Sequence, residues 1–179
     1  MTHRALLPIA AVVCAVATTS AAAVSPRAMA RLRPGSDTAR VLLGDALARS
    51  AIVRGLVEDL ASSDVIVHVD LGRPAGGVAA STVFVTATEH ARYLRVTLDT
   101  MTPPHDLIPF LAHELEHALE IARHPEVRDV AGMRRLYGRI GLNTRALMSY
   151  ETEGARAVER RAREEAEAFS ARAKQRRIP

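Results

Sequence analysis

Two histidines and a glutamate in the second half of the chain have the spacing of a metal site. They are His113, Glu114 and His117, which form the pattern HExxH. On a helix, residues four apart lie one above the other on one face, so the two imidazoles can converge on one tetrahedral Zn²⁺ ion. Glu114 is turned by about 100° from His113 and can accept the proton of a water that attacks a carbonyl group. The pattern therefore predicts one zinc ion per chain, with His113 and His117 as ligands and Glu114 as the general base.

The residues that flank this motif predict a half-buried helix. Apolar residues recur at three- and four-residue steps on both sides of the motif. Asp106 can cap the helix and Pro109 is tolerated in its first turn, whereas His124 and Pro125 end it. Two unpaired histidines would be costly to bury at such a core boundary, which favours metal ligands over solvated side chains.

The motif and its setting resemble the zincin metallopeptidases, in which an HExxH helix lies beneath a small twisted sheet. The chain is also similar to secreted bacterial proteins that carry HExxH. The resemblance implies an α+β, minimal zincin-like fold with an N-terminal helix, a small three-stranded sheet, the HExxH helix and C-terminal helices. It also implies a peptidase whose substrate is a peptide or protein.

The third zinc ligand is not the one that metzincins use. Their third histidine would stand at Arg123, and the glycine before it at Glu120, so this subclass does not fit. Glu120 shares the helix face of His117. It either fixes an imidazole N–H of that histidine or is a surface charge of the helix.

The gluzincin arrangement, with a glutamate from a later helix, offers Glu151 and Glu153. If residues 144–174 form one helix, Glu151 lies on its apolar stripe and Glu153 on its charged stripe. A carboxylate on an apolar stripe is costly unless it is paired or bound to metal, so Glu151 is the predicted ligand and Glu153 the alternative. Ala155 stands where familiar gluzincins have an aspartate. For the oxyanion, the candidates are Tyr137, Tyr150, His105, His124 and Arg145, each of which is also explained as a structural residue.

The remaining elements follow from hydrophobic periodicity. A helix capped by Ser36 or Asp37 is predicted to end at Ser62-Ser63. Alternating and β-branched residues predict strands, the last two forming a hairpin, and the rest of the chain is predicted to be helical. The strands are 65–71, 78–88 and 93–99, and the later helices are 127–140, broken by two glycines, and 144–174. The Arg/Glu run over 156–177 is interpreted as a solvated helix face.

The N-terminal region predicts export. Residues 1–23 have a short basic end, an apolar run and the small residues Ala21 to Ala23, which is typical of a cleaved signal peptide. An uncleaved anchor is the less favoured alternative, because the apolar stretch barely reaches the length of a span. Residues 24–36 are interpreted as a linker and 37–179 as one domain. We therefore expect a secreted or periplasmic protein with no stable membrane span after cleavage.

Composition narrows the class of function. The 179 residues are 48% hydrophobic and 25% charged, which is a globular balance. The net charge of +4 is small, and we expect no nucleic-acid partner. The single cysteine, Cys14, excludes a disulfide scaffold and a CxxC zinc ribbon.

The leading hypothesis is a zinc-dependent peptidase. The alternative is a non-catalytic envelope protein with a zincin-like shell that binds metal or a partner through its Arg-rich C-terminal helix.

Overall fold

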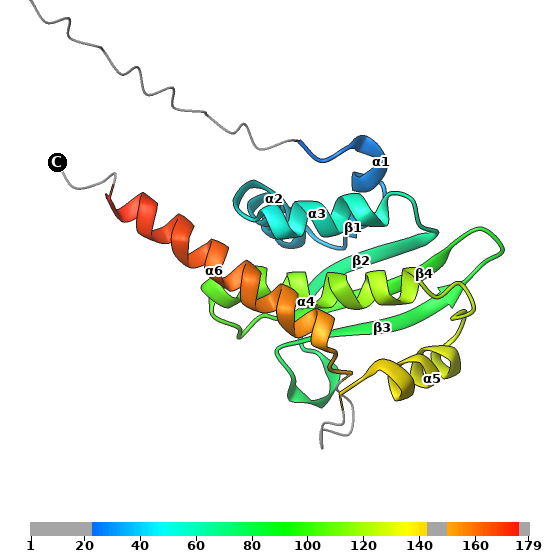
Figure 1. Cartoon of the computed structure of the whole chain (residues 1–179). Helices are drawn as coiled ribbons and strands as arrows, with labels where there is room; N and C mark the ends of the chain where they lie inside the picture. The colour runs from blue at the N-terminus through cyan, green and yellow to red at the C-terminus, as the bar shows by residue number, and fades with distance from the viewer. Residues whose placement is uncertain (1–22, 143–149, 176–179) are drawn as a thin grey trace, which may run out of the picture.

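Alternating apolar residues build the centre of the sheet, as the sequence predicts. The computed structural model describes residues 23–142 and 150–175 (Figure 1). The two central strands are β2 (Val65–Gly72) and β4 (Arg92–Asp99), which pair in parallel. Their inward-facing side chains are fully buried: Val65, Val67, Val69, Leu94, Val96 and Leu98. Polar residues such as His68 and Arg95 alternate with them and face the other side.

The sheet has a fourth strand that the sequence does not predict. Its order over the described residues is β1-β2-β4-β3, with β1 (Leu32–Pro34) parallel to β2 and β3 (Ala80–Ala87) antiparallel to β4. The expected three-stranded sheet is therefore wrong by one strand. The extra strand lies in the segment 24–36 that is interpreted as a linker. A segment of three residues that ends in a proline is too short to show the alternation of apolar and polar residues that predicts a strand. Strand β1 forms because this segment pairs with β2.

Six α-helices complete the described part of this α+β fold. They are α1 (Pro26–Met29), α2 (Asp37–Arg49), α3 (Ala51–Leu60), α4 (Pro104–Ala122), α5 (Val130–Ile140) and α6 (Glu153–Gln175). A 3₁₀ turn, η1 (Ala75–Gly77), precedes β3. In Figure 1, α4 runs across the sheet, α6 crosses α4, and α5 lies near β3. No helix among the described residues is long and apolar enough to cross a membrane.

The helix predicted from Asp37 onward is two helices that meet at Ser50. Ser36 is the N-cap of α2, and its side chain accepts a hydrogen bond from the backbone of Ala39. Ser50 ends α2 and caps α3, because its Oγ accepts from the N–H of Val53 at 3.1 Å. The same hydroxyl donates to Glu165 of α6 at 2.6 Å, which joins the two ends of the fold. The break therefore has a local cause that apolar periodicity does not show.

Helix α4 is buried on almost every side rather than half-buried. From Ile108 to Ile121 every residue except Phe110 is buried. Helices α3 and α6 and strands β3 and β4 pack around it. The HExxH motif therefore lies on the central helix of the fold, where each polar group must find a partner.

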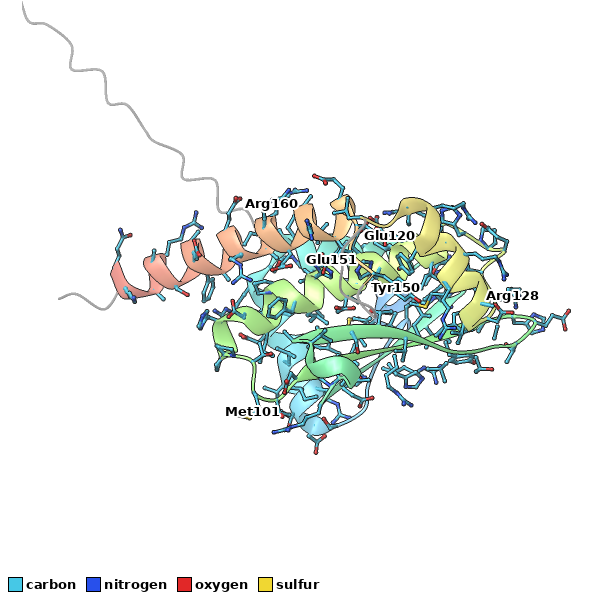
Figure 2. All side chains as sticks on the ribbon, turned by 90° about the horizontal axis from the view of Figure 1, so that it is seen from below. Met101, Glu120, Arg128, Tyr150, Glu151 and Arg160 are labelled. Carbon is cyan, nitrogen blue, oxygen red and sulfur yellow. The ribbon has the colours of Figure 1, made fainter. Side chains whose placement is uncertain are left out.

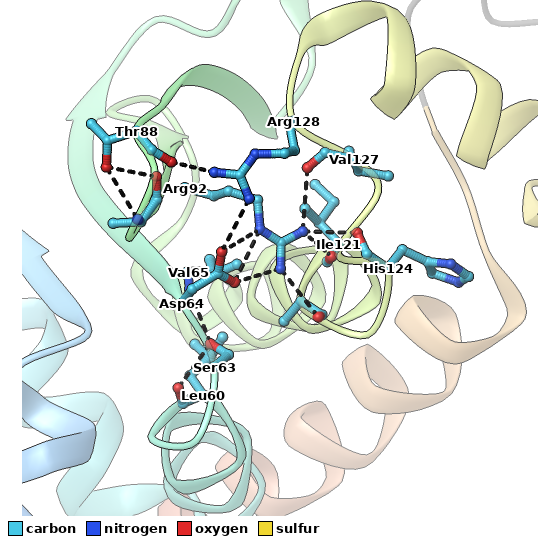
Figure 3. A network of polar contacts seen from close by, with 12 residues as sticks. Leu60, Ser63, Asp64, Val65, Thr88, Arg92, Ile121, His124, Val127 and Arg128 are labelled. Carbon is cyan, nitrogen blue, oxygen red and sulfur yellow. Dashed lines mark hydrogen bonds and ion pairs between the residues drawn. The ribbon is translucent and has the colours of Figure 1, made fainter.

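Arg92, the first residue of β4, fixes the C-terminal end of α4 (Figure 3). Its guanidinium is 1% exposed and donates to the carbonyls of Ile121, His124 and Ala122 at 2.7, 2.8 and 3.2 Å. These carbonyls form the negative end of the helix dipole, so a cation stabilises them. Asp64 accepts from Nε and Nη2 of Arg92 at 3.0 and 2.6 Å. These hydrogen bonds lower the pKa of Asp64.

We expect Arg92→Met to reduce the free energy of unfolding by about 3–5 kcal/mol, because it leaves the buried carbonyls and Asp64 without their donor. Urea denaturation of the purified protein measures this loss. The matched control is Arg95→Met in the same strand, which removes a half-exposed 3.6 Å ion pair with Asp70. That change should cost no more than about 1 kcal/mol. Equal losses in the two variants would show that Arg92 does not anchor α4.

Candidate metal centre

His113 and His117 lie on successive turns of α4 with their ring nitrogens turned toward each other. Their Nε2 atoms are 3.1 Å apart, and the ring planes are inclined by 77°. Both side chains are buried. Two nitrogens on one tetrahedral zinc ion, each at 2.0–2.1 Å, are about 3.3 Å apart. The two imidazoles therefore have the spacing of two ligands of one ion.

A carboxylate holds the other ring nitrogen of each histidine. Glu159 of α6 lies 3.0 Å from Nδ1 of His113, and Glu120 lies 2.8 Å from Nδ1 of His117. An ionised carboxylate only accepts hydrogen bonds, so each Nδ1 carries a proton. If both rings were neutral, their two Nε2 lone pairs would face each other. A cation between the two Nε2 atoms, either a proton or a metal ion, removes the repulsion between their lone pairs.

Glu120 is buried, which agrees with its interpretation as a partner of His117 and not with a surface charge. Its other oxygen accepts from the hydroxyl of Thr152 at 2.5 Å. Burial raises the pKa of Glu120, but the hydrogen bond and the charge of His117, together with the hydrogen bond from Thr152, outweigh it, and the pKa is lowered. Burial likewise lowers the pKa of His117, but Glu120 and Glu114 outweigh it, and the pKa is raised. Each partner therefore favours the charged form of the other.

Glu114 points toward the edge strand β3. Its Oε2 accepts a hydrogen bond from the hydroxyl of Thr82 at 2.7 Å. Burial raises the pKa of Glu114, and the charges of His117 and His113 together with the Thr82 hydrogen bond only partly offset it. A carboxylate with a raised pKa beside the histidine pair is a stronger proton acceptor than an exposed one.

Glu151 lies beside the histidine pair, as predicted, but the helical stripe from which it was predicted does not include it. It precedes α6, which begins at Glu153, so it does not lie on the apolar stripe of that helix. Residues 144–149 of the predicted helix lie outside the described residues. Glu151 Oε1 is 4.0 Å from Nε2 of His113, and Oε2 accepts from Nε of Arg156 at 3.0 Å. The alternative, Glu153, is exposed in the first turn of α6.

The residues around the histidine pair fit a divalent cation in chemistry and in charge. Two imidazoles and one carboxylate are a common ligand set of catalytic zinc. The carboxylates of Glu114, Glu120, Glu151 and Glu159 lie around the pair. Arginines pair with Glu151 and Glu159, and a cation would offset the remaining negative charge. Within residues 23–142 and 150–175, no three His, Cys, Asp or Glu side chains are already close enough to form a complete ligand set. Glu151, with its Oε1 4.0 Å from Nε2 of His113, is the carboxylate that would complete it.

The site opens into a cleft between α4, strand β3 and the segment before α6. The cleft has about 160 Å³ of interior space, and both histidines, Glu114, Tyr150 and Glu151 line it. Figure 2 shows Tyr150 and Glu151 close to α4. Tyr137 and Tyr150 stack with ring centroids 4.6 Å apart and close the side next to α5. A small substrate group can therefore reach the imidazole pair from one side.

Of the other oxyanion candidates, His105 and His124 lie away from the cleft, whereas Tyr137 lines it. His105 is exposed and contacts Asp106, and His124 lies past the end of α4 next to Glu126. Arg145 is outside the described residues. Tyr137 donates its hydroxyl to the carbonyl of His117 at 3.1 Å, and burial raises the pKa of its phenol.

Two functional contacts are missing from the sequence analysis. Thr82 is one of several β-branched residues in a predicted strand, and nothing local marks it as the partner of Glu114. Glu159 belongs to the Arg/Glu run that is interpreted as solvated, yet it binds His113. Its position in the helix could have indicated this contact. Glu159 is four residues after Ala155 and three before Ala162, the two buried residues of α6, so it lies on the same face as they do.

Comparisons with protein-family models, with curated proteins and with solved structures found no match to this chain.

We expect Glu151→Gln to weaken zinc binding by more than about tenfold, because it removes a carboxylate beside the imidazole pair. Glu153→Gln, two residues away and exposed, is the matched control and should leave the affinity nearly unchanged. Competitive titration with a chromophoric chelator compares the two variants side by side. The reverse ranking would assign the ligand to Glu153, and no effect from either change would place the third ligand elsewhere.

Proposed function

We propose that this chain is an exported zinc-dependent peptidase with a zincin-like site. One observation carries the proposal: two buried imidazoles present their Nε2 atoms to each other at 3.1 Å, beside Glu114 and in a cleft. The α+β fold, with the HExxH helix packed against a small mixed sheet, supports the resemblance to zincins. His113, His117 and Glu151 would hold the ion.

The proposed mechanism assigns a separate task to each group. A bound zinc ion would polarise the scissile carbonyl and acidify the attacking water. Glu114 accepts a proton from that water as its oxygen attacks the carbonyl carbon. It then gives the proton to the leaving amine nitrogen, so that the peptide bond breaks and the carboxylate is regenerated. Glu120 and Glu159 keep both imidazoles in the Nδ1–H form, and Thr82 keeps the Glu114 carboxylate directed at the cleft.

The edge of the sheet supports an extended peptide as substrate. Strand β3 pairs with β4 on one side, and no described strand pairs with its other side. Ala80, Ser81 and Thr82 of this strand line the cleft. A substrate that pairs with β3 would therefore pass directly over Glu114.

The second candidate function, partner binding without hydrolysis, has one supporting observation. Every described residue of α6 from Glu167 onward is exposed, and Figure 1 shows this end of the helix extending beyond the sheet. It carries Phe169, which is 45% exposed, and the cations Arg172 and Lys174. A partner could bind this end without using the cleft.

Zinc content tests the proposal first. The purified wild-type protein should bind one zinc ion per chain, and His117→Ala should bind none tightly, because one of the two facing imidazoles is lost. Elemental analysis after dialysis against a weak chelator measures the stoichiometry. A wild-type protein that holds no zinc would overturn the proposed function.

Glu114→Gln should retain zinc and fold but lower the hydrolysis rate about 10²- to 10⁴-fold, because only the proton acceptor is lost. A quenched-fluorescent peptide library provides the rate, and zinc content and circular dichroism are measured on the same samples. Glu116→Gln is the matched control, since it neutralises a carboxylate on the same helix that does not line the cleft and pairs with Arg123. Zinc binding without hydrolysis in the wild type would favour the second candidate function. Full activity in Glu114→Gln would require another base.

A further inference from the structure

Far from the cleft, Glu58 of α3 binds the start of the described chain. Its Oε1 accepts a hydrogen bond from the backbone N–H of Ser25, and its Oε2 accepts from the hydroxyl of Ser25 at 2.9 Å. The same hydroxyl accepts from the N–H of Ala28 at 3.2 Å and caps α1. One carboxylate therefore fixes both the main chain and the side chain of Ser25.

The neighbouring residues mark where the packed chain begins. Val24 is partly buried and packs against the hydrophobic core, whereas Ala23 is exposed. Ala28 in the following turn is fully buried. The peptide bond between Ala23 and Val24 is therefore the last accessible bond before the residues that the core holds, and it is also where the expected signal peptide ends.

Hydrolysis of this bond changes the charge next to Glu58. It consumes one water, leaves a carboxylate on Ala23, and creates a free α-amino group on Val24. This amine has an ordinary pKa near 7.7–8.0 and is protonated at neutral pH. It lies one residue from the N–H that Glu58 already binds, so the carboxylate gains a cation within a few ångströms. Before cleavage, Glu58 has only neutral donors at Ser25.

We propose that the chain is processed between Ala23 and Val24 and that Glu58 binds the new α-ammonium group. Glu58 is then an N-terminal amine site, and the mature fold is stabilised by an ion pair that the precursor cannot form. Because α3 packs on α4, the helix that carries the imidazole pair, the ion pair secures the layer behind the proposed metal site. The proposal does not depend on zinc or on peptidase activity.

Two experiments test the proposal. In the first, the full-length chain is expressed in a bacterium with a functional export system, and the exported protein is analysed by N-terminal sequencing and intact mass. A chain that begins at Val24 is expected. A chain that begins at another residue, or keeps residues 1–23, would overturn the assignment.

The second experiment measures the ion pair in residues 24–179. The chain has one lysine, Lys174, so acetylation near pH 7 selects the α-amine, whose pKa is lower. Acetylation should raise the unfolding equilibrium constant, from urea denaturation, about two- to fivefold. It should do the same in Asp59→Asn, an exposed carboxylate on the same helix, but should have no effect in Glu58→Gln.

A chain that begins at Ala22 provides a further control that does not need the Glu58 variant to fold. It keeps the positive charge but moves it two residues from Val24, and it should be destabilised as much as the acetylated protein. An unchanged unfolding midpoint in this extended chain, or equal effects of acetylation with and without Glu58, would show that no amine site exists.

Discussion

Two buried imidazole nitrogens 3.1 Å apart cannot both present lone pairs without a cation between them. Glu159 and Glu120 impose this state, because each accepts a hydrogen bond from Nδ1 and leaves Nε2 bare. The arrangement of the protein groups alone therefore favours a cation between the two imidazoles. A proton can meet the requirement, and a divalent ion would meet it and also offset the negative charge of the surrounding carboxylates.

The rest of the fold holds this pair in place. Arg92 ties the C-terminal end of α4 to the sheet, and Thr82 ties its middle to the edge strand. Helix α6 adds Glu159 from the other side, with Thr152 just before it supporting Glu120. Because α4 is buried nearly all round, each of these polar contacts replaces a contact with water that burial has removed. The helix therefore cannot shift along its axis without leaving several buried groups unpaired.

The sequence predicts the parts of this arrangement that depend on local periodicity. The HExxH spacing, the central strands and the hairpin follow from repeats of 3.6 and 2 residues. Strand β1 could not be predicted, because pairing along β2 makes it. Glu151 is predicted next to the histidines, yet through a helical phase that does not exist, since α6 begins two residues later. Glu159 is missed because it belongs to the Arg/Glu run that is interpreted as a solvated face, although the buried Ala155 and Ala162 lie four and three residues from it.

Two glutamates of α4, Glu120 and Glu114, differ in their pKa because they have different hydrogen-bond partners. Glu120 receives hydrogen bonds from His117 and Thr152, which lower its pKa and keep it ionised as a fixed acceptor. Glu114, toward β3, has one neutral donor, Thr82, and burial raises its pKa. A carboxylate that is held ionised orients its neighbour but is a poor proton carrier, whereas one with a raised pKa takes up a proton more readily. The electrostatics therefore separate a carboxylate suited to orienting its neighbour from one suited to proton transfer, and the second lines the cleft beside the edge strand β3.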